Sequence, residues 1–247
     1  MTLAIVSAMR EELAAVLALM PDEQPTVVAG REFWRGHLHG HEVVAVLSRI
    51  GKVAAATTAT VLIERFGASR IVFTGVAGGL GPGVNVGDMV VASSFLQHDL
   101  DASPIFPKYE VPLYGASRFA ADPVLTAALA DAARAVLADP RTALGEAACR
   151  EFGLQSPKVH EGLVISGDRF VATTTESLAL RTALPDALAV EMEGAAFAQV
   201  CHDYGIPFAA VRTVSDRADD AAHVDFMAFI RQVASGYSAA VVERLLK

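Results

Sequence analysis

Two glutamates, Glu191 and Glu193, stand two residues apart in the segment LAVEMEGAAFAQVC at positions 188–201. Met192 separates them, and most other residues of the segment are apolar or small. A carboxylate is rarely placed in such surroundings without a partner, because burying its charge is costly. The two acids at the start of this apolar segment therefore indicate that a partner or a ligand is held there.

Further acids follow other predicted strands. Glu12 comes shortly after the first apolar run of the chain, and Asp216 ends the run 206–216. The small residues of TGVAGG, at 74–79, end a third run and would let a ligand lie against the backbone. Ligands of open α/β sheets bind beyond the carboxyl ends of strands. We therefore expect these acids to surround one crevice.

The elements that must position the acids are predicted from hydrophobic periodicity and from glycine and proline breaks. The predicted strands are 3–8, a hairpin over 32–48 that turns near Gly40, 70–77, 87–95, 160–167, 186–192 and 206–216. The predicted helices are 10–20, 51–67, 122–139, 193–205 and 223–246, and a loop is expected over 99–117. Because the hairpin adds antiparallel strands to a parallel set, we expect a three-layer α/β/α sandwich with a central mixed β-sheet, formed by residues 1–247 as one domain.

The composition excludes several classes of protein. Hydrophobic residues make up 53% of the chain, and the formal net charge is −8. An acidic protein lacks the basic face that binds nucleic acid or an anionic membrane, so neither partner is expected. Cys149 and Cys201 are far apart, which favours a reducing compartment. The apolar start LAIVSAM is too short for a signal segment, and we expect a soluble cytoplasmic protein.

Seven segments, in chain order, carry a resemblance to a known family. They are AMREEL (8–13), RIGKVAAA (49–56), TGVAGGL (74–80), VGDMVV (86–91), GLVISGDRFV (162–171), AVEMEGAAFAQVC (189–201) and VRTVSDRAD (211–219). The chain resembles the 5′-methylthioadenosine/S-adenosylhomocysteine nucleosidases, within the nucleoside phosphorylase superfamily. This resemblance implies hydrolysis of an N-glycosidic bond in methionine salvage, without a cofactor or a metal. Methylthioadenosine, S-adenosylhomocysteine and 5′-deoxyadenosine are the expected substrates.

The resemblance implies three acids with distinct roles. Asp216 would give a proton to adenine N7, and Glu12 would deprotonate the attacking water. Glu193 would bind the ribose hydroxyls and offset positive charge on the oxocarbenium-like ring. Two carboxyl groups on opposite sides of a sugar bond are the arrangement of inverting glycoside hydrolysis.

The same resemblance implies a set of substrate contacts. Phe170 would stack on the base, whose Watson–Crick edge the backbone of Val171 would read. Arg212 would keep Glu193 ionised and oriented. The other expected substrate-binding residues are Met192 against the sugar, Ser215 beside Asp216, Glu191 as a support, and Met9, Ile50, Val76, Ala77, Gly78 and Phe226.

The chain departs from the family pattern in three places. Val76 stands where many members carry serine, so we expect it to line the pocket without a polar contact. Arg49 replaces a common glycine, and its cation could mimic a phosphate-binding group. The loop 99–117 differs from common members, although the resemblance implies a homodimer in which this loop covers the 5′-substituent of the neighbouring subunit. Its candidate pocket residues are Ile105, Phe106 and Pro112.

Structural interpretations of single residues remain beside the functional ones. Glu12 could complement the dipole of its helix, and Asp216 could cap the turn that follows it. Met192 and Phe170 could be ordinary core residues. His37, His39 and His41 alternate, but a turn at Gly40 favours exposed hairpin residues over a zinc site. The ligand-type residues of HDLD (98–101) form another weak metal candidate.

Other functions also remain open from the sequence. A purine nucleoside phosphorylase would need several arginines around a phosphate, and Arg10 and Arg49 are the only candidates near the strand ends. A futalosine hydrolase is a second alternative. A non-catalytic protein that binds adenine nucleosides is disfavoured, because Glu12, Glu193 and Asp216 are all present.

Overall fold

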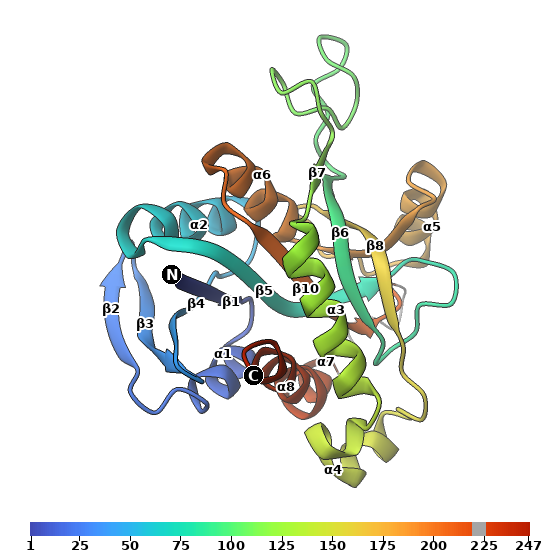
Figure 1. The fold of residues 1–247 in the computed structure, drawn as a ribbon. Coiled ribbons are helices and arrows are strands. Elements are labelled where there is room, and N and C mark those ends of the chain that lie inside the picture. Colours follow the sequence, from blue (N-terminus) through green and yellow to red (C-terminus); the bar gives the residue numbers. More distant parts are fainter. Residues whose placement is uncertain (219–225) are drawn as a thin grey trace.

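The computed structural model describes residues 1–218 and 226–247, and its strands form one mixed sheet (Figure 1). The strands are β1 (Thr2–Ser7), β2 (Gln24–Val28), β3 (Arg31–Leu38), β4 (His41–Leu47), β5 (Ala68–Gly79), β6 (Met89–Gln97), β7 (Arg118–Ala120), β8 (Val159–Ser166), β9 (Ala187–Glu191) and β10 (Phe208–Asp216). The helices are α1 (Arg10–Leu17), α2 (Lys52–Phe66), α3 (Pro123–Leu137), α4 (Pro140–Glu151), α5 (Thr174–Ala183), α6 (Gly194–Tyr204), α7 (Phe226–Phe229), the π-helical turn η1 (Ile230–Ala234) and α8 (Ser235–Leu245).

Strand β5 organises the sheet. It runs parallel to β1 on one side and to β10 on the other, and β4, β3 and β2 extend the sheet beyond β1. On the other side, β10 pairs with β6, β6 with β8, and β8 with β9. Strand β9 then returns to β5 through antiparallel pairing at Gly78 and Gly79. The predicted mixed sheet is confirmed, and five of its strands close into a ring.

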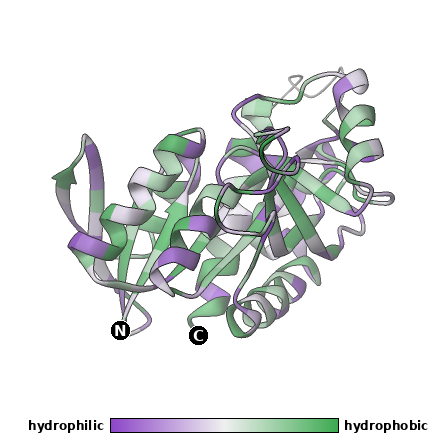
Figure 2. Ribbon diagram, turned by 90° about the horizontal axis from the view of Figure 1, so that it is seen from above, coloured by the Kyte–Doolittle hydropathy of each residue, from purple (hydrophilic) through white to green (hydrophobic). Residues whose placement is uncertain are grey.

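The two faces of the sheet are covered by different helices. Helices α2 and α6 lie together over one face, and α1, α3 and α8 lie over the other (Figure 1). Side chains along β5 alternate between the two resulting cores: Phe73 packs on the first with Phe197, and Val72 packs on the second. This alternation follows from the two-residue period of a strand. Figure 2 shows the same arrangement from above, with mostly hydrophobic central strands.

Four short elements lie outside the predicted ones. The strands β2 and β7 and the helices α4 and α5 were not predicted. Strand β2 has an almost fully exposed side-chain pattern and exists through its pairing with β3. Helix α4 is interrupted at Gly145, where φ is 81°. Strands β2 and β7 depend on tertiary pairing and α4 is broken by a local turn, so the periodicity of these three elements is weak.

The predicted long elements are present with shifted ends. Helix α1 stops at Leu17, three residues before the predicted end. The predicted helix 223–246 corresponds to α7, η1 and α8 over residues 226–245, and its first three residues lie outside the described residues. Among the described residues, no helix is long and apolar enough to cross a bilayer.

The predicted loop 99–117 is confirmed as a long excursion between β6 and β7. It projects away from the body of the molecule (Figure 1). A single bridge between Val111 and Ala116 ties its tip together. Ile105 and Leu113 of this loop are 82% and 90% exposed, so the loop presents two large apolar side chains to solvent.

Candidate active site

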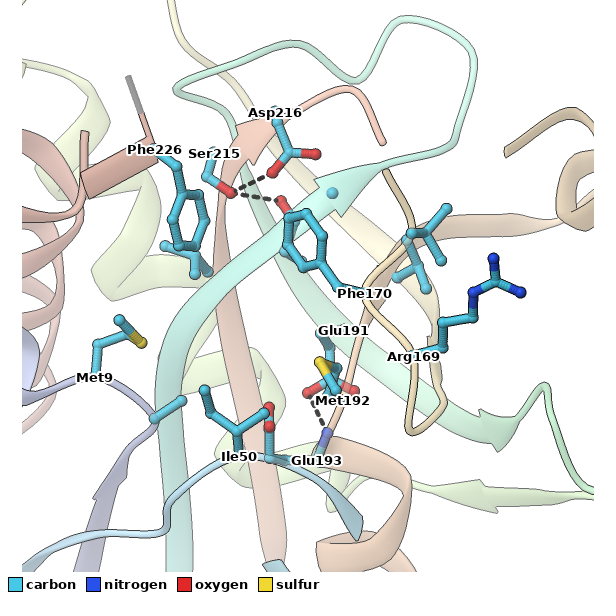
Figure 3. Close-up of a pocket in the computed structure, with 16 residues that line it drawn as sticks. Met9, Ile50, Arg169, Phe170, Glu191, Met192, Glu193, Ser215, Asp216 and Phe226 are labelled. Carbon is cyan, nitrogen blue, oxygen red and sulfur yellow. Dashed lines mark hydrogen bonds between the residues drawn. The ribbon is translucent and has the colours of Figure 1, made fainter. Parts of the chain in front are cut away.

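A pocket lies at the carboxyl ends of β1, β5, β9 and β10 (Figure 3). It encloses about 730 Å³ of empty space, part of which is open to solvent. Its lining residues are Ala8, Met9, Ile50, Val76, Ala77, Gly78, Arg169, Phe170, Val171, Val190, Glu191, Met192, Glu193, Ser215, Asp216 and Phe226. The closed ring of strands explains this convergence, because it brings the end of β9 beside the end of β5.

Two predicted site residues, Glu12 and Arg212, are not part of the lining, and both are buried. The prediction missed three lining residues: Ala8, Arg169 and Val190. Each is the direct neighbour of a predicted residue and lies in one of the segments that carry the family resemblance, which are the signals that could have found them. In Figure 3 the side chain of Arg169 extends away from the other labelled side chains.

Asp216 lies at the end of β10 and at one end of the pocket (Figure 3). Its Oδ2 is 2.8 Å from the hydroxyl of Ser215, which can donate to it, and its Oδ1 accepts the N–H of Ala218 at 2.8 Å. The Ser215 hydroxyl also lies 3.4 Å from the carbonyl of Ala77. A hydroxyl has one proton, so these two contacts alternate. The arrangement orients the Asp216 carboxyl at the pocket wall.

Glu193 is the N-cap residue of α6, yet its side chain does not cap that helix. Its Oε1 instead accepts the N–H of Gly51 at 2.9 Å. Burial, followed by the charge of Glu191, raises the pKa of Glu193 to about 7, against the opposing effects of the Gly51 N–H and Arg212. Such a carboxyl carries a proton in part of the population at neutral pH. A cationic ligand would favour its ionised form.

The partner of Arg212 differs from the expected one. Its Nη2 donates to Glu191 Oε2 at 2.8 Å, and the structure shows no hydrogen bond from Arg212 to Glu193 among the described residues. The guanidinium also stacks over the ring of Phe73 at 3.9 Å. The prediction that Arg212 directly orients Glu193 is therefore wrong. Its charge acts on Glu193 only through space, where it favours the ionised carboxylate.

Glu191 has the role of capping α6. Its carboxylate accepts the N–H groups of Glu193 at 3.1 Å and Gly194 at 2.8 Å, and it also accepts the hydroxyl of Ser166. The Ser166 oxygen in turn accepts the N–H of Ala195 at 2.8 Å. The free N–H groups at the start of α6 are thus satisfied by side chains from β8 and β9. This leaves the Glu193 carboxylate available to the pocket.

Glu12 is completely buried near the start of α1. Its Oε2 accepts the N–H of Met9 at 3.2 Å, so Glu12 contributes a cap to the start of its own helix, a contact that the sequence did not predict. Its Oε1 is buried and has no hydrogen-bond partner among the described residues. Burial raises the pKa of Glu12 to about 8. A solvated first-turn acid would show neither property, and an unpaired buried oxygen indicates a missing partner.

Aromatic and aliphatic side chains form the rest of the wall. Phe170 and Phe226 meet edge to face, with ring centroids 6.0 Å apart. Phe170 is 46% exposed, so its interpretation as a core residue is wrong. Met192 lines the pocket and is half-buried, and Val76 lines it with an apolar side chain. The pocket therefore has carboxyl groups at its ends and an apolar middle.

The candidate phosphate-binding and metal-binding residues lie elsewhere. Arg49 has φ of 67° and donates to the carbonyl of Gly30. Asp99 of the HDLD segment forms a 2.5 Å ion pair with Lys52, and His37 pairs with Asp22 at 2.8 Å. Among residues 1–218 and 226–247, no group of three or more histidine, cysteine or acidic side chains is arranged to hold a metal ion.

The fold and this pocket define a member of the phosphorylase superfamily, whose family model matches residues 2–247. A curated 5′-methylthioadenosine/S-adenosylhomocysteine nucleosidase from Chromohalobacter salexigens is 39% identical and covers 99% of this chain and 96% of its own. The crystal structure of the corresponding nucleosidase from Neisseria meningitidis with methylthio-immucillin-A has a TM-score of 0.87 and 34% identity, covering 100% and 98% of the two chains.

Within the superfamily, the chain therefore belongs to the 5′-methylthioadenosine/S-adenosylhomocysteine nucleosidases. A structure of futalosine hydrolase from Helicobacter pylori is also similar, with a TM-score of 0.83, 31% identity and coverage of 99% and 96%. The predicted family and mixed α/β fold are confirmed by these comparisons.

The raised pKa values of Glu12 and Glu193 predict how stability depends on pH. Their folded-state pKa values of about 8 and about 7 lie above the ordinary 4.5. The folded state therefore binds these protons more tightly than the unfolded state does. The stabilising contribution is complete below about pH 4.5 and is lost as pH rises through 7 and then 8. Between about pH 5 and about pH 9, Glu12 alone would lower the free energy of unfolding by roughly 3–5 kcal/mol.

Urea denaturation at several pH values measures this dependence. Glu12→Gln should make the decline smaller from about pH 4.5 to about pH 8, and Glu193→Gln only from about pH 4.5 to about pH 7. Glu11→Gln, which changes the neighbouring acid on the same helix, serves as the control and should follow the wild type. A decline of the same size in all three variants would contradict the assignment.

Proposed function

We propose that this protein hydrolyses the N-glycosidic bond of methylthioadenosine and S-adenosylhomocysteine, and also that of 5′-deoxyadenosine. The products are adenine and the 5′-substituted ribose, as methionine salvage requires. One observation carries the proposal: a single pocket holds Asp216 at one end and Glu193 at the other, with Phe170 between them (Figure 3). The separation of the two carboxyl groups, with an aromatic ring between them, suits a purine joined to a ribose. The likeness to the named nucleosidases supports the same substrates.

Asp216 is the general acid in this proposal. Adenine is a poor leaving group as an anion, so the C1′–N9 bond breaks more readily when a proton reaches N7. The Ser215 hydroxyl and the Ala218 N–H hold the Asp216 carboxyl at the end of the pocket where the base would lie. Phe170 stacks on the base, and the backbone of Val171 meets its Watson–Crick edge.

Glu193 acts on the sugar. As the bond to adenine breaks, positive charge develops on the ribose ring, and a buried carboxylate stabilises that charge more strongly than it would in water. The same charge favours the ionised form of Glu193, whose pKa of about 7 leaves it poised between two states. Its oxygens bind the ribose hydroxyls, with Met192 against the ring.

Glu12 is the base for the attacking water. The water oxygen forms the new bond to C1′, and its proton passes to the Glu12 carboxylate. Burial raises the pKa of Glu12 to about 8, so its carboxylate is the minor form at neutral pH, and this ionised form is a stronger base than an ordinary carboxylate. The unpartnered Oε1 supplies an acceptor for that proton. Afterwards Glu12 loses a proton to solvent and Asp216 regains one.

A second candidate is hydrolysis of futalosine. It is favoured by the similarity to a solved futalosine hydrolase, whose TM-score of 0.83 is close to that of the nucleosidase structure. Phosphorolysis has less support. The one arginine among the lining residues is Arg169, whose side chain extends away from the pocket centre in Figure 3. A phosphate would need several converging cations.

The first functional prediction is hydrolysis that does not require phosphate. With methylthioadenosine as substrate, the sugar product should be free 5-methylthioribose at the same rate with and without phosphate. Mass spectrometry of the sugar identifies it. S-adenosylhomocysteine, 5′-deoxyadenosine and futalosine are compared in parallel reactions. A strict need for phosphate and a ribose-1-phosphate product would show a phosphorylase instead, and faster turnover of futalosine would favour the second candidate.

The second functional prediction separates the two acids of the pocket. Asp216→Asn keeps the shape of the side chain but removes its proton, so kcat should fall by roughly 10²–10⁴ while substrate binding survives. Glu193→Gln removes the charge that favours the cationic transition state. Both turnover and affinity for cationic transition-state mimics should then fall. Steady-state kinetics and inhibitor titration measure these effects.

Two outcomes would contradict the assigned roles. One is near-normal turnover of Asp216→Asn. The other is a Glu193→Gln enzyme whose KM alone rises. Asp122→Asn is a suitable control, because Asp122 caps α3 through a 2.8 Å bond from Leu125 N–H and is not a lining residue.

We also propose that the protein is a homodimer in which the loop 99–117 reaches the 5′ end of the neighbouring pocket. The exposed Ile105 and Leu113 support this, since an apolar loop that projects from the body gains stability when a second copy covers it. Phe106 and Pro112 of the same loop would join the wall around the 5′-substituent. Met9, Ile50 and Phe226 form the part of this wall contributed by the chain itself.

Light scattering at micromolar concentration tests the assembly. We expect a dimer for the wild type, and a shift toward monomer with a higher KM for Ile105→Asp. Val27→Asp changes another exposed apolar residue, on the edge strand β2, and should leave the dimer intact. A fully active monomeric wild type would overturn the proposal.

A further inference from the structure

We propose that Lys52, Asp99 and Asp168 form a bridge of positioning residues that holds the base-binding loop 167–171 against the start of α2. This inference rests on the proposed nucleosidase function. None of the three residues lines the pocket, so none is expected to touch the substrate. Their effect would pass through Phe170 and Glu193.

Hydrogen bonds join the three residues of the bridge to one another. The backbone N–H of Lys52 donates to Asp168 Oδ1 at 2.7 Å, and its Nζ donates to Asp99 Oδ1 at 2.5 Å. The backbone N–H of Asp168 donates to Asp99 Oδ2 at 2.8 Å. Each residue is thus bonded to both others. Three chain segments that are far apart in sequence are joined at one point.

Two of these bonds start from backbone N–H groups, which distinguishes the bridge from an ordinary surface ion pair. The side chains of Lys52 and Asp99 are 17% and 31% exposed, so solvent screens their charges only in part. Hydrogen bonds from a backbone N–H to a carboxylate are charge-assisted and directional. The bridge can therefore fix the position of a loop, which a flexible surface pair does poorly.

The start of α2 connects the bridge to the ribose end of the pocket. Gly51, the N-cap residue, has no side chain to cap the helix, and its N–H donates to Glu193 Oε1. The next N–H, that of Lys52, donates to Asp168. Two adjacent N–H groups of one helix end thus hold acids from two different segments. The distance between those two acids is set by one rigid turn of backbone.

Asp168 connects the bridge to the base end. It precedes Phe170 by two residues, and Phe170 and Val171 both line the pocket. Because the Phe170 side chain is 46% exposed, its own packing holds it weakly. An anchored Asp168 fixes the backbone from which Phe170 and Val171 project. The loop would otherwise sample several positions, and the base would bind with a larger loss of entropy.

Asp99 connects the bridge to the projecting loop, which starts at this residue. The bridge therefore links three parts of the site: the loop 99–117, the carboxylate of Glu193 and the base-binding loop 167–171. It also assigns a role to Asp99, the first of the two acids of the HDLD segment, which the metal interpretation did not explain.

The test compares Asp168→Ala, Asp168→Asn and Lys52→Met in methylthioadenosine hydrolysis. Loss of a hydrogen bond to a charged group suggests that Asp168→Ala raises KM on the order of 10-fold, with a smaller fall in kcat. Asp168→Asn keeps an acceptor oxygen for the Lys52 N–H and should recover most of the loss. Because both residues belong to one bridge, the effects of Lys52→Met and Asp168→Ala on KM should not be additive.

Asp22→Ala is the matched control. Asp22 also accepts a backbone N–H and a side-chain nitrogen, both from His37 at 2.8 Å, but it does not line the pocket. Its kinetics should equal those of the wild type. Thermal unfolding of each variant confirms that it is folded. If Asp168→Ala does not fold, the milder change Asp99→Asn replaces it in the test.

Two results would overturn the bridge. One is a folded Asp168→Ala enzyme with KM within about twofold of the wild type, which is well below the effect of a lost charged hydrogen bond. The other is additivity of Lys52→Met and Asp168→Ala. An inactive wild type would instead overturn the nucleosidase proposal. In that case, calorimetry of adenine binding to the same variants tests the bridge. We expect weaker binding by Asp168→Ala and unchanged binding by Asp22→Ala.

Discussion

The buried ion pair between Arg212 and Glu191 is the interaction on which the rest of the site depends. Removing two charges from water is costly, and the cost is offset only when the remaining hydrogen-bonding groups are satisfied. Glu191 meets this condition through Arg212, Ser166 and the first N–H groups of α6. The same contacts place the beginning of α6 at the end of β9. Glu193 thereby faces the pocket, and its carboxylate does not cap its own helix.

Helices α2 and α6, which both begin beside the pocket, use this arrangement. Neither α2 nor α6 is capped by the side chain of its own N-cap residue. Their N–H groups are satisfied by acids from other segments: Glu193 and Asp168 for α2, and Glu191 for α6. The positive ends of the helix dipoles offset the charge of the acids gathered there. Three carboxylates are therefore held near one cavity by backbone geometry, which changes little when a ligand enters.

The distribution of polar groups in the pocket matches the chemistry of a nucleoside. The carboxyls lie at its ends, where proton transfer and charge development would occur, and the middle is lined by Val76, Phe170 and Met192. An apolar middle binds a flat base and excludes water, which strengthens the electrostatic effect of the acids. Glu12 differs from Glu193 and Asp216 because it has a fully buried oxygen without a hydrogen-bond partner among the described residues.

The acids that follow strands could be located from the residue pattern. Hydrophobic periodicity marks the long buried elements, and chain direction puts the acids at one edge, so Glu193 and Asp216 were predicted beside one crevice. The partner of each group, in contrast, follows from tertiary packing. Glu191 and Glu193 are two residues apart, and Arg212 pairs with Glu191 because β5 holds both β9 and β10 beside it. The edge strand β2 and the Lys52–Asp99–Asp168 bridge likewise arise from contacts between distant segments, which local residue patterns do not encode.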